Sequence, residues 1–161
     1  MSLSIIFVIL LVAMFILSYL TKRRFGVLGL ALAAGAMLSD LWAEKLTPYV
    51  AESGVVNLQT PPLAVLVAVL IVILPAILLL FLGGPTYKSK LLRFVGSAAF
   101  AILALALVVG PLDGTLALDG VSQQIYDFVF DNRVWIVTAG LIYAIWDLVI
   151  TRTPKGIKRK R

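Results

Sequence analysis

Two aspartates, Asp40 and Asp147, are the side chains best placed to do chemistry, because each lies at or inside a long apolar stretch. A carboxylate within a membrane segment is costly and faces protein or water, where it can relay protons or bind cations. On a helix, Gly140, Tyr143 and Ala144 share the face of Asp147. This pattern allows an ion or proton relay. The alternative, which we favour because Asp147 is about one turn from the end of its apolar run, is a structural pair with Lys22, Arg23, Arg24, Lys88 or Arg152.

Asp40 and Asp147 each lie near the C-terminal end of an apolar segment, and the predicted topology places those two ends on opposite sides of the bilayer, so we do not expect an acid–base dyad. A relay between them would need intermediate polar groups, for which Ser39, Ser97 and Thr138 are the candidates. Thr138 faces nearly opposite Asp147 on a helix, so the sequence offers no continuous polar path.

Composition excludes most catalytic classes. Histidine and cysteine are both absent, which removes disulfides, His-based triads, thiol nucleophiles and the commonest metal ligands. Gly83-Gly84 lacks the Gly-Lys-Ser/Thr continuation of a phosphate-binding loop. We therefore expect no enzyme, no cofactor and no metal. With 61% hydrophobic residues and a mean hydropathy of +1.07, a soluble domain of this length could not bury its apolar surface, so the bilayer must be the solvent.

Five apolar runs of membrane-spanning length predict an all-α polytopic bundle: 3–20, 25–42, 63–82, 94–110 and 134–151. Eighteen helical residues span roughly 27 Å. A cleaved signal peptide is disfavoured for the first run, because it has no basic region before it. Residues 43–62 are predicted to be an external loop with a short interfacial piece. Within 112–133, the spacing of Val121, Ile125, Phe128 and Val129 predicts a short amphipathic helix before the last span, lying in the interface or packed on the bundle as a lid.

Basic residues predict the orientation. Three follow the first run, three follow the third run and six lie in the tail, whereas only Lys45 and Arg133 fall elsewhere. The positive-inside rule therefore places the N-terminus outside and the C-terminus inside, in a bacterial cytoplasmic (inner) membrane. Residues 1–151 form one predicted transmembrane bundle and 152–161 a basic cytoplasmic tail. The tail predicts binding to anionic lipid head groups and, lacking aromatic residues, no nucleic acid. The predicted lipid-binding residues are Lys155, Lys158, Arg159, Lys160 and Arg161.

Small residues recur at three- and four-residue spacing in the second and fourth runs, which predicts close helix packing in lipid. The predicted packing residues are Gly26, Gly29, Ala33, Ala36, Gly96, Ala99, Ala106 and Gly110. Pro75 interrupts the third run and predicts a tolerated kink, with a transport hinge as the less favoured alternative.

The first four runs make two similar hairpins, each entered through Arg-Phe at Arg24-Phe25 and Arg93-Phe94. Together with the turn from Lys22 to Gly26 and the segment Leu92 to Gly96, this pattern resembles the bacterial colicin V production protein family over residues 4–112. Members usually carry an Arg-Gly pair in the first turn, where this chain has Arg24 and Phe25, and a further Gly and Arg in the fourth helix, where it has Ala99 and Phe100. The resemblance implies a small inner-membrane protein with an accessory role.

The leading functional prediction is a non-enzymatic integral membrane scaffold or accessory subunit, bound to a membrane-protein partner or forming a homo-oligomer. The alternative is a small transporter or channel component that uses Asp147 or Asp40.

Overall fold

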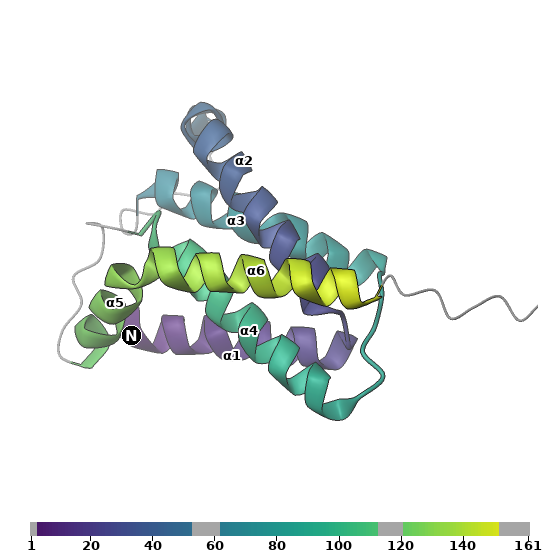
Figure 1. Cartoon of the computed structure of the whole chain (residues 1–161). Coiled ribbons are helices and arrows are strands. Elements are labelled where there is room, and N and C mark those ends of the chain that lie inside the picture. The colour runs from purple at the N-terminus through teal and green to yellow at the C-terminus, as the bar shows by residue number, and fades with distance from the viewer. Residues whose placement is uncertain (1–2, 53–61, 113–120, 152–161) are drawn as a thin grey trace, which may run out of the picture.

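The computed structural model describes residues 3–52, 62–112 and 121–151. Within these ranges the regular structure is helical, apart from one isolated bridge between Arg23 and Thr86 (Figure 1). The six helices are α1 (Leu3–Thr21), α2 (Phe25–Glu52), α3 (Leu63–Leu82), α4 (Lys90–Val109), α5 (Val121–Asp131) and α6 (Arg133–Thr151). The prediction of an all-α chain is confirmed, and α3 has the bounds of the third apolar run.

The helices pack around α4, which contacts each of the other five (Figure 1). α2 lies along α3 and also packs against α6 and α4, whereas α1 packs mainly on α4. α5 contacts α4 and α6, so the predicted amphipathic helix exists and touches the bundle.

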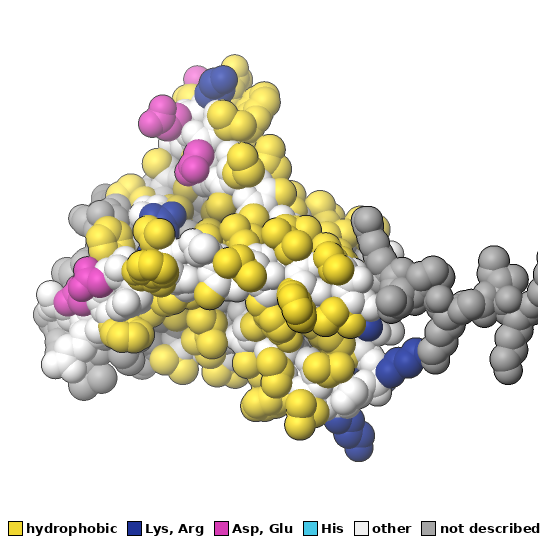
Figure 2. Space-filling model, viewed as in Figure 1, with side chains coloured by type: hydrophobic (Ala, Val, Ile, Leu, Met, Phe, Trp, Pro, Cys, Tyr) yellow, Lys and Arg dark blue, Asp and Glu magenta, His cyan; other side chains and the backbone are white. Residues whose placement is uncertain are grey.

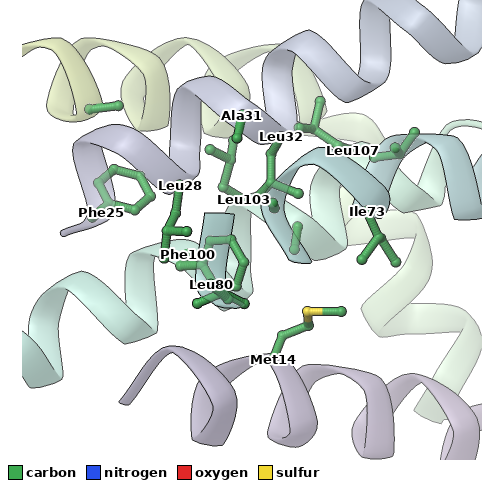
Figure 3. Close-up of a cluster of buried hydrophobic side chains, with 14 of the residues drawn as sticks. Met14, Phe25, Leu28, Ala31, Leu32, Ile73, Leu80, Phe100, Leu103 and Leu107 are labelled. Atoms are coloured by element: carbon green, nitrogen blue, oxygen red, sulfur yellow. The ribbon is translucent and has the colours of Figure 1, made fainter. Parts of the chain in front are cut away.

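The core lies where α2, α3 and α4 meet, with side chains from α1 and α6 at its edges (Figure 3). Phe25, Leu32 and Phe100 are fully enclosed there. The other large core side chains are Met14, Leu28, Val72, Ile73, Leu80, Tyr87, Leu103, Leu107 and Val108. This interior is almost entirely hydrocarbon, so close packing is the main interaction along the helices.

Gly35 of α2 lies against the turn of α3 that precedes Pro75. Pro75 has no N–H and therefore leaves the carbonyl of Ile71 without its helical hydrogen bond. A Cβ at Gly35 would overlap the carbonyl oxygen of Val72 and would lie 3.1 Å from that of Ile71. The absence of a side chain at Gly35 thus lets the α2 backbone lie close to the α3 turn whose Ile71 carbonyl lacks its helical hydrogen bond. α3 continues as a helix through Pro75.

The prediction that the second helix ends at residue 42 is wrong, because α2 continues to Glu52 through Pro48. Proline costs about 3 kcal/mol in a helix interior, mostly through a lost hydrogen bond and a clash with the preceding turn. Next to it, the Thr47 hydroxyl donates to the Ala43 carbonyl at 2.7 Å. The surroundings of Pro48 are exposed, so the freed carbonyl of Glu44 is not trapped in the core.

Four described helices are long and apolar enough to cross a membrane: α2, α3, α4 and residues Arg133–Ile150 of α6. α1 contributes a shorter described apolar segment, Val8–Thr21. α6 is the least covered, and its outward side chains are Val134, Trp135, Ile142, Ile145, Trp146, Val149 and Ile150.

Candidate functional site: the polar cluster at the start of α2

The turn between α1 and α2 is built against the turn between α3 and α4. The Arg24 N–H donates to the Pro85 carbonyl at 3.1 Å, and the Tyr87 N–H donates to the Lys22 carbonyl at 2.9 Å. The Arg23 guanidinium donates to the Gly84 carbonyl at 2.6 Å. These bonds join two turns that are more than sixty residues apart in the sequence, so the turns of the two hairpins are held together.

This junction positions two acceptors at the first turn of α2. The Phe25 N–H donates to the Tyr87 hydroxyl oxygen at 3.1 Å. The Gly26 N–H donates to Asp147 Oδ2 at 2.9 Å. The first N–H groups of a helix have no partner within it, so side chains from two other segments satisfy them here.

Glycine and aromatic contacts bring these side chains into place. A Cβ at Gly26 would lie 2.6 Å from the Ala144 carbonyl oxygen, so only glycine lets α6 approach this closely. The rings of Phe25 and Tyr143 stack with their centroids 5.0 Å apart. On the other side, a Cβ at Gly96 would lie 2.6 Å from the Tyr87 ring.

The electrostatics favour a carboxylate at this position. Helix N-termini carry a partial positive charge, which stabilises an anion such as the Asp147 side chain. The Arg24 guanidinium lies 5.5 Å from the centroid of the Tyr87 ring. Burial raises the pKa of Tyr87, the hydrogen bond from the Phe25 N–H opposes this shift, and the nearby charge of Asp147 raises the pKa further. The phenol therefore stays protonated at neutral pH.

The geometry makes this cluster a clamp between three segments of the chain. Asp147 accepts a hydrogen bond from the α2 backbone at Gly26, a partner that is not among the basic side chains predicted for it. Among the described residues, no three acidic side chains lie close enough together to hold a metal ion.

Asp40 is not part of the cluster. It is exposed on α2, fourteen residues beyond Gly26, which corresponds to about 21 Å along a helix. Of the proposed relay residues, Ser39 donates to the Ala68 carbonyl at 3.1 Å, Ser97 is buried in α4, and Thr138 is exposed on α6.

The predicted packing residues fall into several different contacts. Gly26 and Gly29 face Ala144 of α6. Ala33, Ala36 and Ala99 are half-buried, and Ala106 is completely buried. A Cβ at Gly110 would overlap the Arg133 guanidinium at the end of α4. The basic residues of the tail lie outside the described residues.

Sequence reasoning missed the roles of Gly35 and Tyr87, and it considered Ser39 only as a relay candidate and not as a packing residue. Gly35 and Ser39 both contact α3, and a signal was present, because Ala31, Gly35 and Ser39 repeat every four residues. Tyr87 had no such signal, since a tyrosine in a Gly/Pro turn gives no periodicity from which burial can be inferred.

The fold and cluster define a class: an α-helical bundle with several apolar helices long enough to cross a membrane, joined at one end by a capped helix N-terminus. Comparison with known protein families, with curated proteins and with solved structures finds no match for this chain. The resemblance to the colicin V production protein family stays a prediction from residues 4–112.

Proposed function

We propose that the chain crosses a bacterial cytoplasmic membrane five times, with α1 as the first span, the N-terminus outside and the C-terminus inside. The four long apolar helices and the apolar part of α1 support this proposal. Charge placement supports the orientation, because acidic side chains gather at the projecting end of α2 and near α5, where Lys45 and Arg133 also lie, whereas further Lys and Arg lie at the opposite end (Figure 2). Positive charge marks the cytoplasmic side.

Within that membrane, we propose that the protein is a non-enzymatic scaffold or accessory subunit of a larger assembly. The observation that carries this proposal is the apolar, closely packed interior of the bundle. Its buried polar side chains, among the described residues, are Ser18, Ser39 and Ser97, and Asp147 is bonded to the α2 backbone. A transport path needs a continuous series of polar groups, which this interior does not supply.

The small-residue faces that motivated the scaffold prediction pack the chain's own helices. Gly26 and Gly29 are covered by α6, and Gly35 is covered by α3. A partner therefore binds on the outward faces, and among the four long apolar helices α6 is the least covered. Substituting Gly29 by leucine is accordingly a test of folding and not of partner binding.

Single-cysteine cross-linking tests the proposal directly, because the chain contains no cysteine. Cysteines at Ile142 and Ile145, which are exposed on α6, are compared with cysteines at Ile9 and Val12 on α1. We expect cross-links to one defined membrane protein, or to a second copy, from one of these faces only. Cross-links from neither face contradict a scaffold.

Reconstitution separates the transporter alternative. We expect proteoliposomes containing the purified chain to show no more ion flux than protein-free vesicles. Flux that is lost in Asp147→Asn or Asp40→Asn while the protein stays folded overturns the scaffold proposal in favour of a transporter.

A further inference from the structure

The last two turns of α2 extend beyond the helix on which α2 packs. Gly35 lies opposite Val72, and Ser39 bonds to Ala68, so the two helices run antiparallel in a fixed register. Continuing this register places Glu44 opposite Leu63, where α3 begins. Residues 45–52 therefore extend roughly 12 Å past the start of α3. Figure 1 shows this end of α2 standing away from the other helices.

We call residues 41–52 the α2 arm. Its side chains include purely apolar groups, aromatic rings that carry a polar atom, and charged groups. Leu41, Trp42 and Tyr49 are 64%, 49% and 71% exposed. Tryptophan and tyrosine are enriched where hydrocarbon meets the head-group layer, because one end of each ring is apolar and the other polar.

A shallow, open hollow lies on one face of the arm, and the described residues that line it all belong to α2: Trp42, Lys45, Leu46, Pro48, Tyr49 and Glu52. The Lys45 ammonium lies 5.5 Å from the centroid of the Trp42 ring. One cation and one anion, seven residues apart, thus flank an aromatic surface on a single helix.

We propose that the α2 arm lies in the head-group layer of the outer leaflet and that the hollow binds the head group of a zwitterionic phospholipid. Lys45 pairs with the lipid phosphate, and Glu52 pairs with the ammonium group. Trp42 and Tyr49 pack against the glycerol region. This inference rests on the proposed membrane location of the bundle.

Charge complementarity favours a zwitterionic lipid over an anionic lipid and over a second copy of the chain. The described acidic residues at this end, Asp40, Glu44, Glu52, Asp127 and Asp131, outnumber its two bases, Lys45 and Arg133. An anionic lipid, or a second copy presenting the same acidic surface, is repelled by this excess. A zwitterion brings both charges that the hollow can pair and adds no net charge.

Depth-dependent fluorescence quenching tests the position of the arm. The double variant Trp135→Phe, Trp146→Phe leaves Trp42 as the only tryptophan, and it is reconstituted in phosphatidylethanolamine brominated near the top of the acyl chains. We expect this lipid to quench roughly half of the Trp42 fluorescence, and lipid brominated near the chain ends to quench much less. Equal emission with and without brominated lipid overturns the proposal, as does shielding of Trp42 from both brominated lipid and aqueous acrylamide, which indicates a protein cover.

A matched variant distinguishes this inference from the proposed function. Trp146, which is exposed on α6, becomes the only tryptophan when Trp42 and Trp135 are replaced by phenylalanine. Quenching of Trp146 without quenching of Trp42 overturns the arm proposal alone. Quenching of neither residue overturns the membrane location itself.

Lipid retention tests the recognition chemistry. Native mass spectrometry is used to count phosphatidylethanolamine molecules bound by the wild type, Lys45→Ala and the control Lys90→Ala, an exposed lysine at the opposite end. We expect Lys45→Ala to lose one bound molecule and Lys90→Ala to lose none. Equal retention by the two variants, or stronger binding of phosphatidylglycerol than of phosphatidylethanolamine at the arm, overturns the head-group assignment.

Discussion

The first turn of α2 and its last two turns differ in their hydrogen-bond partners and in how far other helices cover them. At the start, Tyr87 and Asp147, which belong to distant segments of the chain, accept hydrogen bonds from the first N–H groups of the helix. At the end, residues 45–52 extend beyond α3, and the helix continues through Pro48 with an exposed aromatic surface. One end is a junction of the fold, whereas the other is a surface.

This difference shows which contacts determine how the helices are arranged. In lipid, apolar contact alone discriminates poorly between helix arrangements, because the tails are as apolar as leucine. Polar bonds at the start of α2 and close glycine contacts along it therefore fix the arrangement. The arm contributes none of these contacts, so the fold leaves it available for a different task.

The largest expected effect comes from disrupting the close contact between Gly35 of α2 and the backbone of α3. Gly35→Leu places a side chain on the Val72 carbonyl, which belongs to a rigid helix. We expect a loss of more than about 3 kcal/mol, because backbone cannot move aside as a flexible side chain does. Thermal unfolding in detergent, followed by circular dichroism, measures the loss.

The control for this substitution is the neighbouring residue Ala34, which is exposed. Ala34→Leu adds the same side chain on the outer face, so we expect a change within about 0.5 kcal/mol. Similar destabilisation by both substitutions contradicts the assigned contact between Gly35 and α3.

The second prediction breaks the junction at the start of α2. Asp147→Leu leaves the Gly26 N–H without its acceptor and removes a negative charge from the helix N-terminus. We expect a loss of about 2 kcal/mol. Asp147→Asn retains an acceptor oxygen, so we expect roughly half that loss. Hydrogen exchange at the Gly26 amide should accelerate more in the leucine variant, and equal rates in the two variants contradict the bond.

Sequence reasoning predicted the helices well where hydropathy alone decides them. The third apolar run has the bounds of α3, and the amphipathic spacing of Val121 and Phe128 correctly indicated α5. The end of α2 was predicted wrongly, because Pro48 and the charges of Glu44 and Lys45 are typical of a loop. Here the proline lies where the helix is exposed, so it does not end α2.

The candidate site was predicted only in part. Asp147 was identified, because a charge in an apolar run is conspicuous, but its bond to the Gly26 N–H was not foreseen. A backbone donor carries no sequence signature. Tyr87 was missed for a related reason, since its burial depends on Gly96 and on the pairing of two distant turns.

The third prediction separates the two acceptors at this junction. Tyr87→Phe keeps the ring against Gly96 but removes the oxygen that accepts from the Phe25 N–H. We expect a loss of about 1 kcal/mol, the usual net contribution of one hydrogen bond. Because Tyr87 and Asp147 act on adjacent N–H groups, the double variant Tyr87→Phe, Asp147→Leu should differ from the sum of the single losses. Strict additivity would show that the two bonds form independently.

The smallest expected effect lies at the other end of α2. Tyr49→Ala removes an exposed ring from the arm, so the free energy of unfolding should change by less than about 0.5 kcal/mol. In detergent, amides of residues 45–52 should exchange much faster than those of residues 29–35, because residues 29–35 are packed on other helices, whereas residues 45–52 extend beyond α3. A loss of stability comparable with that of Tyr87→Phe, or equal exchange along the whole of α2, would show that the arm belongs to the core and that the two ends of the helix are held alike.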